Sequence, residues 1–129
     1  LSEAGTISTR TSTVTGTPGF QSKEVMKGEK VSTASDIYSF GCVLIELFGN
    51  RRVWPNLTPC QIMCQVVVEG RCPQTDGIGP DSLQEVCSRC TAGDPTERPS
   101  AIDTLYALLQ LSPPHVIQRL IIQTYEYQL

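Results

Sequence analysis

Four of the six cysteines have a spacing that could hold a metal ion. Cys60 and Cys64 are followed by Cys87 and Cys90, and two pairs of thiolates can complete a tetrahedral zinc site. Both pairs also have helical spacing beside apolar residues, which predicts that they pack in a core as small hydrophobic side chains. We favour the core interpretation and keep a helical zinc module as an alternative. A disulfide framework is favoured least, because no secretory pattern accompanies the cysteines.

Hydroxyl side chains occupy seven of the ten positions from residue 6 to residue 15. Taken alone, such a stretch predicts a polar loop. His115 is the one histidine, and no local motif supplies it with a triad partner. The sequence has neither a Gly-rich phosphate loop nor a Walker lysine. We therefore assign no catalytic, cofactor-binding or metal-ligating residue to this chain.

The composition bounds the class of protein. The chain has 129 residues, a net charge of −3 and 18% charged residues, which suits one domain without a basic field for nucleic acid or an anionic membrane. It has no signal-peptide pattern and no apolar run long enough to span a bilayer. The first residue is not Met, so we expect a piece of a longer protein. We expect it inside the cell, in the cytoplasm or in the cytoplasmic part of a membrane protein.

Any site in this chain must be positioned by the apolar stretch that ends at Phe48. After Asp36 its only charged residue is Glu46, and a helix that is apolar on all sides is normally buried all round. The pattern therefore predicts a central buried helix over 33–48. Thr33 is its expected N-cap, and Gly49 with Asn50 is expected to end it.

Further helices are expected around this one, and no convincing strand. A short turn over 21–27 precedes Gly28, and Thr58 with Pro59 begins a helix that Gly70 closes. Asp81 is expected to cap a third helix and Ser100 a fourth. The apolar side of the fourth is predicted to consist of Ile102, Leu105, Leu108 and Leu109.

Three motifs resemble those of eukaryotic protein kinases in their order and separation. They run from Gly16 to Glu24, from Asp36 to Gly41 and from Asp94 to Ser100. They resemble the end of the activation segment, the start of the central helix of the large lobe, and the loop between its last two helices. The resemblance covers residues 1 to about 111. It is greatest to the tyrosine-kinase-like group, with a substrate loop of the serine/threonine type.

The resemblance implies a mainly α fold, a partial protein-kinase-like large (C-terminal) lobe with helices packed round a central buried helix. The kinase part would be residues 1–111, with the activation segment and substrate loop in 1–24, the central helix in 33–48 and the C-terminal helices in 58–111. Residues 112–129 would form a C-terminal tail helix.

The resemblance also implies roles for single residues. Glu24 and Arg98 would form a buried ion pair, Asp36 would hold the catalytic loop of the complete domain, and Gly41 would be structural. Phosphorylation for activation would fall on Thr11, Ser12 or Thr13. The loop that contacts the protein substrate would consist of Gly16, Thr17, Pro18, Gly19 and Phe20.

By this resemblance the parent protein transfers the γ-phosphate of ATP, with Mg²⁺, to a serine or threonine of a protein. The Gly-rich loop, the nucleotide-binding lysine and the H-R-D and D-F-G motifs are missing. We therefore expect the chain to contribute substrate docking and regulation without activity of its own. Its partners would be protein substrates, regulatory proteins or an upstream kinase, and the remainder of its kinase domain.

Two departures from the family pattern keep a second function open. Ser22 and Lys23 replace the alanine and proline of the A-P-E motif, and Thr91 stands where the family usually has tryptophan. The alternative is a pseudokinase or scaffold lobe that binds partner proteins near Trp54 and Ile62.

Overall fold

A computed structural model describes residues 18–111 and 122–123, and within these ranges the chain is helical and contains no strand. This confirms the mainly α fold. The predicted tail helix over 112–129 lies outside the described residues except at 122–123, which are helical. No helix of the described part is long and apolar enough to cross a membrane. The elements are η1 (Pro18–Phe20), α2 (Lys23–Met26), α3 (Thr33–Gly49), α4 (Pro59–Met63), η2 (Cys64–Val68), α5 (Asp81–Cys90), η3 (Pro95–Glu97) and α6 (Ala101–Gln110).

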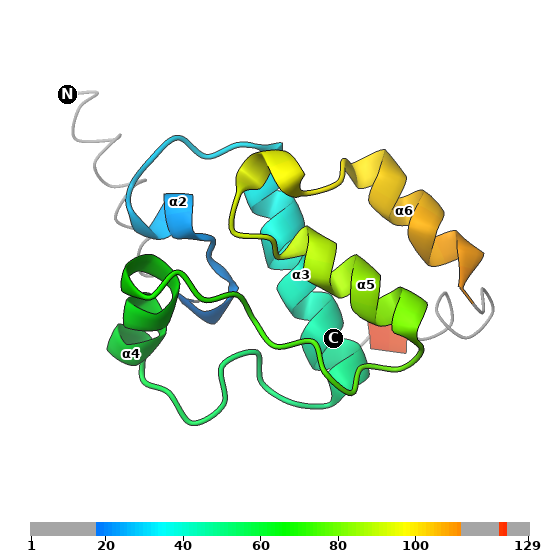
Figure 1. Cartoon of the computed structure of the whole chain (residues 1–129), viewed down its shortest axis with the longest axis horizontal. Coiled ribbons are helices and arrows are strands. Elements are labelled where there is room, and N and C mark those ends of the chain that lie inside the picture. The colour runs from blue at the N-terminus through cyan, green and yellow to red at the C-terminus, as the bar shows by residue number, and fades with distance from the viewer. Residues whose placement is uncertain (1–17, 112–121, 124–129) are drawn as a thin grey trace.

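Helix α3 lies at the centre of the described part (Figure 1). It contacts α5, η1 and η3, and α5 in turn contacts α6. Cys42, Leu44 and Ile45 on α3 are fully buried, and side chains from α5 and α6 join them in one hydrophobic cluster. The predicted central helix is therefore present and organises the core.

The N-cap of α3 is Ser32, so the prediction of Thr33 is wrong by one residue. The hydroxyl of Ser32 accepts a hydrogen bond from the amide of Ala34 at 3.2 Å, and the amide of Ser32 donates to the hydroxyl of Ser35 at 3.3 Å. Two neighbouring residues can each cap a helix, and the sequence does not indicate which one keeps the extended backbone. At the other end, Asn50 takes the left-handed conformation, with φ of 53°.

The prediction that this helix is buried on every side is wrong for one stripe. Asp36 is exposed, and Phe40, Val43 and Leu47, on the same face, are only half-buried. Residues at this spacing share one side of a helix. Because the described elements pack mainly against the other sides of α3, this stripe remains accessible.

Gly41 permits the close packing of α3 against α5. A Cβ atom at residue 41 would lie 2.7 Å from Cβ of Cys90 and 2.8 Å from Cγ2 of Thr91, which is too close for carbon atoms. The hydroxyl of Thr91 donates to the carbonyl of Cys87 at 2.8 Å.

The predicted cap of α5 is wrong by one residue. The residue before α5 is Pro80, and Asp81 is the first residue of the helix.

Residues 59–68 form two different helical turns, where a single helix was predicted. Thr58 begins α4 with a capping box, in which its hydroxyl accepts from the amide of Gln61 at 3.2 Å. After Met63 the turn widens, and the amide of Glu69 donates to the carbonyl of Cys64, five residues earlier, at 3.0 Å. Hydrogen bonds of this span define a π turn.

Helix α6 begins at its predicted cap, where the hydroxyl of Ser100 accepts from the amide of Asp103 at 3.0 Å. The prediction of which side chains form its apolar side is mostly wrong. Thr104 and Leu108 are buried against the core, whereas Ile102, Leu105 and Leu109 are exposed. Apolar residues occur on both sides of this helix, and periodicity does not indicate which side another element covers.

Candidate functional site

Glu24 and Arg98 meet in a buried ion pair. The Nη1 atom of Arg98 lies 2.7 Å from Oε2 of Glu24, and Nη2 donates to Oε1 at 3.2 Å. Arg98 also donates to the carbonyls of Ala34 at 2.9 Å and Ala92 at 2.8 Å. The side chain of Arg98 is 0% exposed and that of Glu24 is 10% exposed. One guanidinium thereby joins α2, the start of α3 and the segment between α5 and α6.

The surroundings of Glu24 favour its charged form. Burial alone would raise the pKa of this carboxyl, but hydrogen bonds from Arg98, from a backbone amide and from the hydroxyl of Ser35 lower it to about 2. The Ser35 hydroxyl donates to Oε2 at 2.8 Å. The guanidinium of Arg98 also lies 5.0 Å from the centroid of the Tyr38 ring, within the range of a cation–π interaction.

The described part of the expected substrate loop is tied to α3. The hydroxyl of Ser39 donates to the carbonyl of Phe20 at 2.7 Å, and η1 contacts both α3 and α4. Gly16 and Thr17 of this loop, and the candidate phosphorylation sites Thr11, Ser12 and Thr13, lie outside the described residues.

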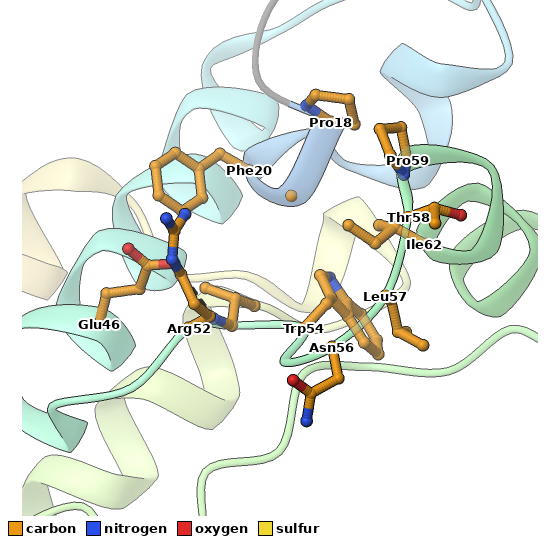
Figure 2. Close-up of a pocket in the computed structure, with 12 residues that line it drawn as sticks. Pro18, Phe20, Glu46, Arg52, Trp54, Asn56, Leu57, Thr58, Pro59 and Ile62 are labelled. Atoms are coloured by element: carbon orange, nitrogen blue, oxygen red, sulfur yellow. Dashed lines mark hydrogen bonds between the residues drawn. The ribbon is translucent and has the colours of Figure 1, made fainter.

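An open pocket of about 540 Å³ lies beside η1. Figure 2 shows its walls, which come from η1, from Glu46 near the end of α3, and from the segment that leads into α4. The lining residues are Pro18, Gly19, Phe20, Glu46, Arg52, Val53, Trp54, Asn56, Leu57, Thr58, Pro59 and Ile62.

The pocket combines apolar surface with one cationic side chain. Phe20, Trp54 and Ile62 supply apolar surface, and the side chain of Arg52 points toward Phe20 and Glu46 (Figure 2). Glu46 accepts a hydrogen bond from the amide of Val53 at 3.1 Å. Arg52 is exposed and forms no ion pair with another described residue. Such a pocket can hold an apolar side chain of a protein segment and an acidic group next to it.

The four cysteines with metal-like spacing do not come together. Cys87 and Cys90 are buried, as the core interpretation predicted, but Cys60 and Cys64 are exposed and their assignment to the core is wrong. Burial raises the pKa of Cys87 to about 12, which disfavours the thiolate that zinc requires. Within residues 18–111 and 122–123, no three potential metal ligands converge. The zinc alternative is therefore not supported.

Comparison with known proteins identifies the family. The profile described as "Protein tyrosine and serine/threonine kinase" matches residues 5–108. The chain belongs to the protein kinase family. Its relatives include "Cytokinesis protein sepH" of Aspergillus niger, 34% identical over 90 residues, and "Probable serine/threonine-protein kinase drkB" of Dictyostelium discoideum, 31% identical over 90 residues. "Serine/threonine-protein kinase CTR1" of Arabidopsis thaliana is 30% identical over 105 residues.

The chain is short beside these kinases. The matched part is 70% of this chain and 7% of the sepH protein, 70% and 13% for drkB, and 77% and 12% for CTR1. The helical architecture around α3 is consistent with a partial large lobe of a kinase domain. The profile spans all three motifs on which the resemblance was based.

The described residues do not fit the nucleotide and metal that kinases use. Phosphoryl transfer requires carboxylates that hold Mg²⁺ next to the phosphates of ATP. The pocket beside η1 has one carboxylate, that of Glu46, and no three metal-binding side chains meet in the described part. We therefore assign no step of phosphoryl transfer to these residues.

The sequence analysis missed three polar residues of α3 that support this site. Ser35 binds Glu24, Ser39 binds the backbone of η1, and Tyr38 packs against Arg98. Polar side chains in an otherwise apolar buried helix need hydrogen-bond partners. The presence of these three residues in the predicted buried helix could therefore have indicated that they contact polar groups elsewhere in the chain.

Proposed function

We propose that this chain is the substrate-docking part of the large lobe of a serine/threonine protein kinase. The parent would transfer the γ-phosphate of ATP to serine or threonine of a protein, and would use ATP and Mg²⁺ held by other parts of its domain. The observation that carries the proposal is the loop Pro18–Phe20, anchored to α3 by Ser39 and next to the open pocket. Serine/threonine kinases among the relatives support it.

A protein segment suits the pocket better than a small molecule. The pocket is open. Trp54 and Ile62 give it apolar surface, and Arg52 gives it a cation. An extended segment can place an apolar side chain against the indole and an acidic side chain near Arg52. Charge pairs at such a rim contribute mainly to specificity and to the association rate.

The half-buried stripe of α3 would receive the remainder of the kinase domain. Asp36 is exposed at one end of this stripe, which continues through Phe40, Val43 and Leu47. Covering these apolar side chains would stabilise the assembled domain. Asp36 would then hold the catalytic loop, the role that family membership suggests for it.

Regulation is also proposed on the basis of family membership. Thr11, Ser12 and Thr13 would be phosphorylated by an upstream kinase inside the cell, and the added charge would order the activation segment where cationic partners are close. Mass spectrometry of the parent protein after its activation would test which of the three carries phosphate.

Trp54 is the one tryptophan of the chain, so its fluorescence reports directly on the pocket. We expect acidic peptides with an aromatic residue to change this fluorescence in a saturable way. Arg52→Gln should weaken their binding severalfold. Arg89→Gln, which removes an exposed arginine of α5 outside the pocket, is the matched control and should leave binding unchanged. An equal effect of both variants would contradict docking at this pocket.

Catalysis separates this proposal from a scaffold function. The chain alone should not phosphorylate a generic protein substrate in the presence of ATP and Mg²⁺, whereas the complete kinase domain of the parent should. A complete domain that binds the peptides without phosphorylating any of them would favour the pseudokinase or scaffold alternative. Binding of a partner protein at the pocket near Trp54 and Ile62 requires no catalytic group, so the pocket is compatible with that alternative as well.

A further inference from the structure

A second, smaller cavity lies away from the substrate-docking pocket. Its volume is about 60 Å³, and it lies between α2, α3, the segment after η2 and the segment that leads to η3. About 10–15 Å³ of such space is enough for one water molecule, so the cavity accommodates a larger group. Its wall includes the exposed residues Arg71 and Cys72, which open it to the surface.

Three of the side chains around this cavity are positively charged. Lys23, Arg71 and Arg98 line it, and no carboxylate does. Arg98 is neutralised by Glu24, but neither Lys23 nor Arg71 forms an ion pair with another described residue. Two cations that have no ion-pair partner within the described part of the chain produce a local positive potential at this small cavity, and such a potential attracts an anion.

The cavity also borders a buried hydrogen-bond donor without an acceptor. Tyr38 is 2% exposed, lines the cavity, and its hydroxyl has no hydrogen-bond partner among the described residues. Burial raises the pKa of Tyr38, so the hydroxyl keeps its proton. Buried polar groups in proteins almost always have partners, and this one belongs to a residue that lines the cavity.

We propose that this cavity binds a phosphoryl group, with Lys23 and Arg71 neutralising its charge and the Tyr38 hydroxyl donating to one of its oxygens. A phosphoryl group offers several strong acceptor oxygens and up to two negative charges. These match the two cations and the one hydroxyl donor that have no partner among residues 18–111 and 122–123. The group can come from free orthophosphate or from a phosphorylated side chain. Because Arg98 also lines the cavity, an anion bound there would act on the contacts that join α2 to the segment after α5.

Calorimetric titration of the 129-residue chain with orthophosphate, at constant ionic strength set with chloride, tests the proposal. We expect saturable binding of one phosphate per chain. Arg71→Gln and Lys23→Gln should each weaken it about tenfold, because a charge-assisted hydrogen bond contributes that much to affinity. Arg89→Gln removes an exposed arginine outside the cavity and should leave the affinity unchanged.

Tyr38→Phe separates binding from folding. Because the hydroxyl has no partner in the described structure, this variant should unfold at the same urea concentration as wild type in chloride buffer, yet bind phosphate several times more weakly. A loss of stability in chloride would mean that the hydroxyl already has a partner, and would overturn the proposal. The proposal would also be overturned if phosphate did not bind in a saturable way, or if Arg89→Gln lost as much affinity as Arg71→Gln.

A parallel titration with O-phosphoserine distinguishes the two sources of the group. Binding of both probes, with the same dependence on Arg71, would assign the cavity to a phosphorylated side chain. Binding of orthophosphate alone would assign it to the free anion. Either result supports a phosphoryl site, and both are independent of peptide binding at Trp54.

Discussion

Replacing Arg98 by alanine should destabilise the lobe more than any exposed charge mutation. The substitution leaves the carboxylate of Glu24 buried without its cation and removes the donors to the carbonyls of Ala34 and Ala92. Loss of one partner of a buried pair costs about 3–5 kcal/mol. We therefore expect Arg98→Ala to lower the free energy of unfolding by about that amount.

The lowered pKa of Glu24 gives an independent value for the free energy that this ion pair contributes, and the two values are similar. This pKa falls from an ordinary value of 4.5 to about 2 in the folded chain. A difference of about 2.5 in pKa corresponds to at most about 3–4 kcal/mol, since each pKa unit is ~1.4 kcal/mol. A carboxyl with a lowered folded pKa stabilises the fold above its unfolded pKa. This contribution should be complete above about pH 4.5 and should disappear as the pH falls towards 2.

Urea unfolding at pH 7 and at intervals down to pH 2 measures both effects. Wild type should lose stability through this acid range more steeply than Glu24→Gln, which has no carboxyl to protonate at that position. Lys27→Ala is the matched control, because the Lys27–Glu29 pair is exposed and should contribute at most about 1 kcal/mol. If Arg98→Ala does not fold, Arg98→Lys keeps the charge without the forked geometry and should still be clearly destabilised.

The reasoning would be refuted by an Arg98→Ala protein whose stability at pH 7 lies within about 1 kcal/mol of wild type, as expected for Lys27→Ala. Equal acid sensitivity of wild type and Glu24→Gln would refute the pKa argument separately.

Three further predictions concern the packing and exposure of other residues. Gly41→Ala should destabilise the chain by about 1–3 kcal/mol in urea, because its Cβ has no room against α5; unchanged stability would mean that the two helices separate easily. Asp36→Asn should cost at most about 1 kcal/mol in this chain, since its exposed carboxylate interacts mainly with the helix dipole, and a larger loss would reveal a buried role. A thiol reagent applied to the native chain should modify Cys60, Cys64 and Cys72 quickly and leave Cys42, Cys87 and Cys90 unmodified until urea is added; rapid modification of all six would contradict the core.

Much of this lobe follows from the sequence alone. The apolar stretch after Asp36 is dense enough to require a central helix, and hydroxyl residues before helical patterns marked α4 and α6, because a cap acts on amides within one turn of itself. The order of the three motifs was sufficient to indicate the family. Each of these inferences depends on residues close together in the chain, or on a motif that can be identified without the rest of the domain.

Tertiary structure decided what covers each helix. Leu108 is buried and Ile102 is exposed on the same helix, although both are apolar, because α5 packs against only one side of α6. Cys60 and Cys87 have similar local patterns and opposite exposure for the same reason. Local periodicity determines that a helix has an apolar side, whereas burial depends on which distant element reaches it. The cavity beside Tyr38 likewise exists only because segments far apart in the chain meet there.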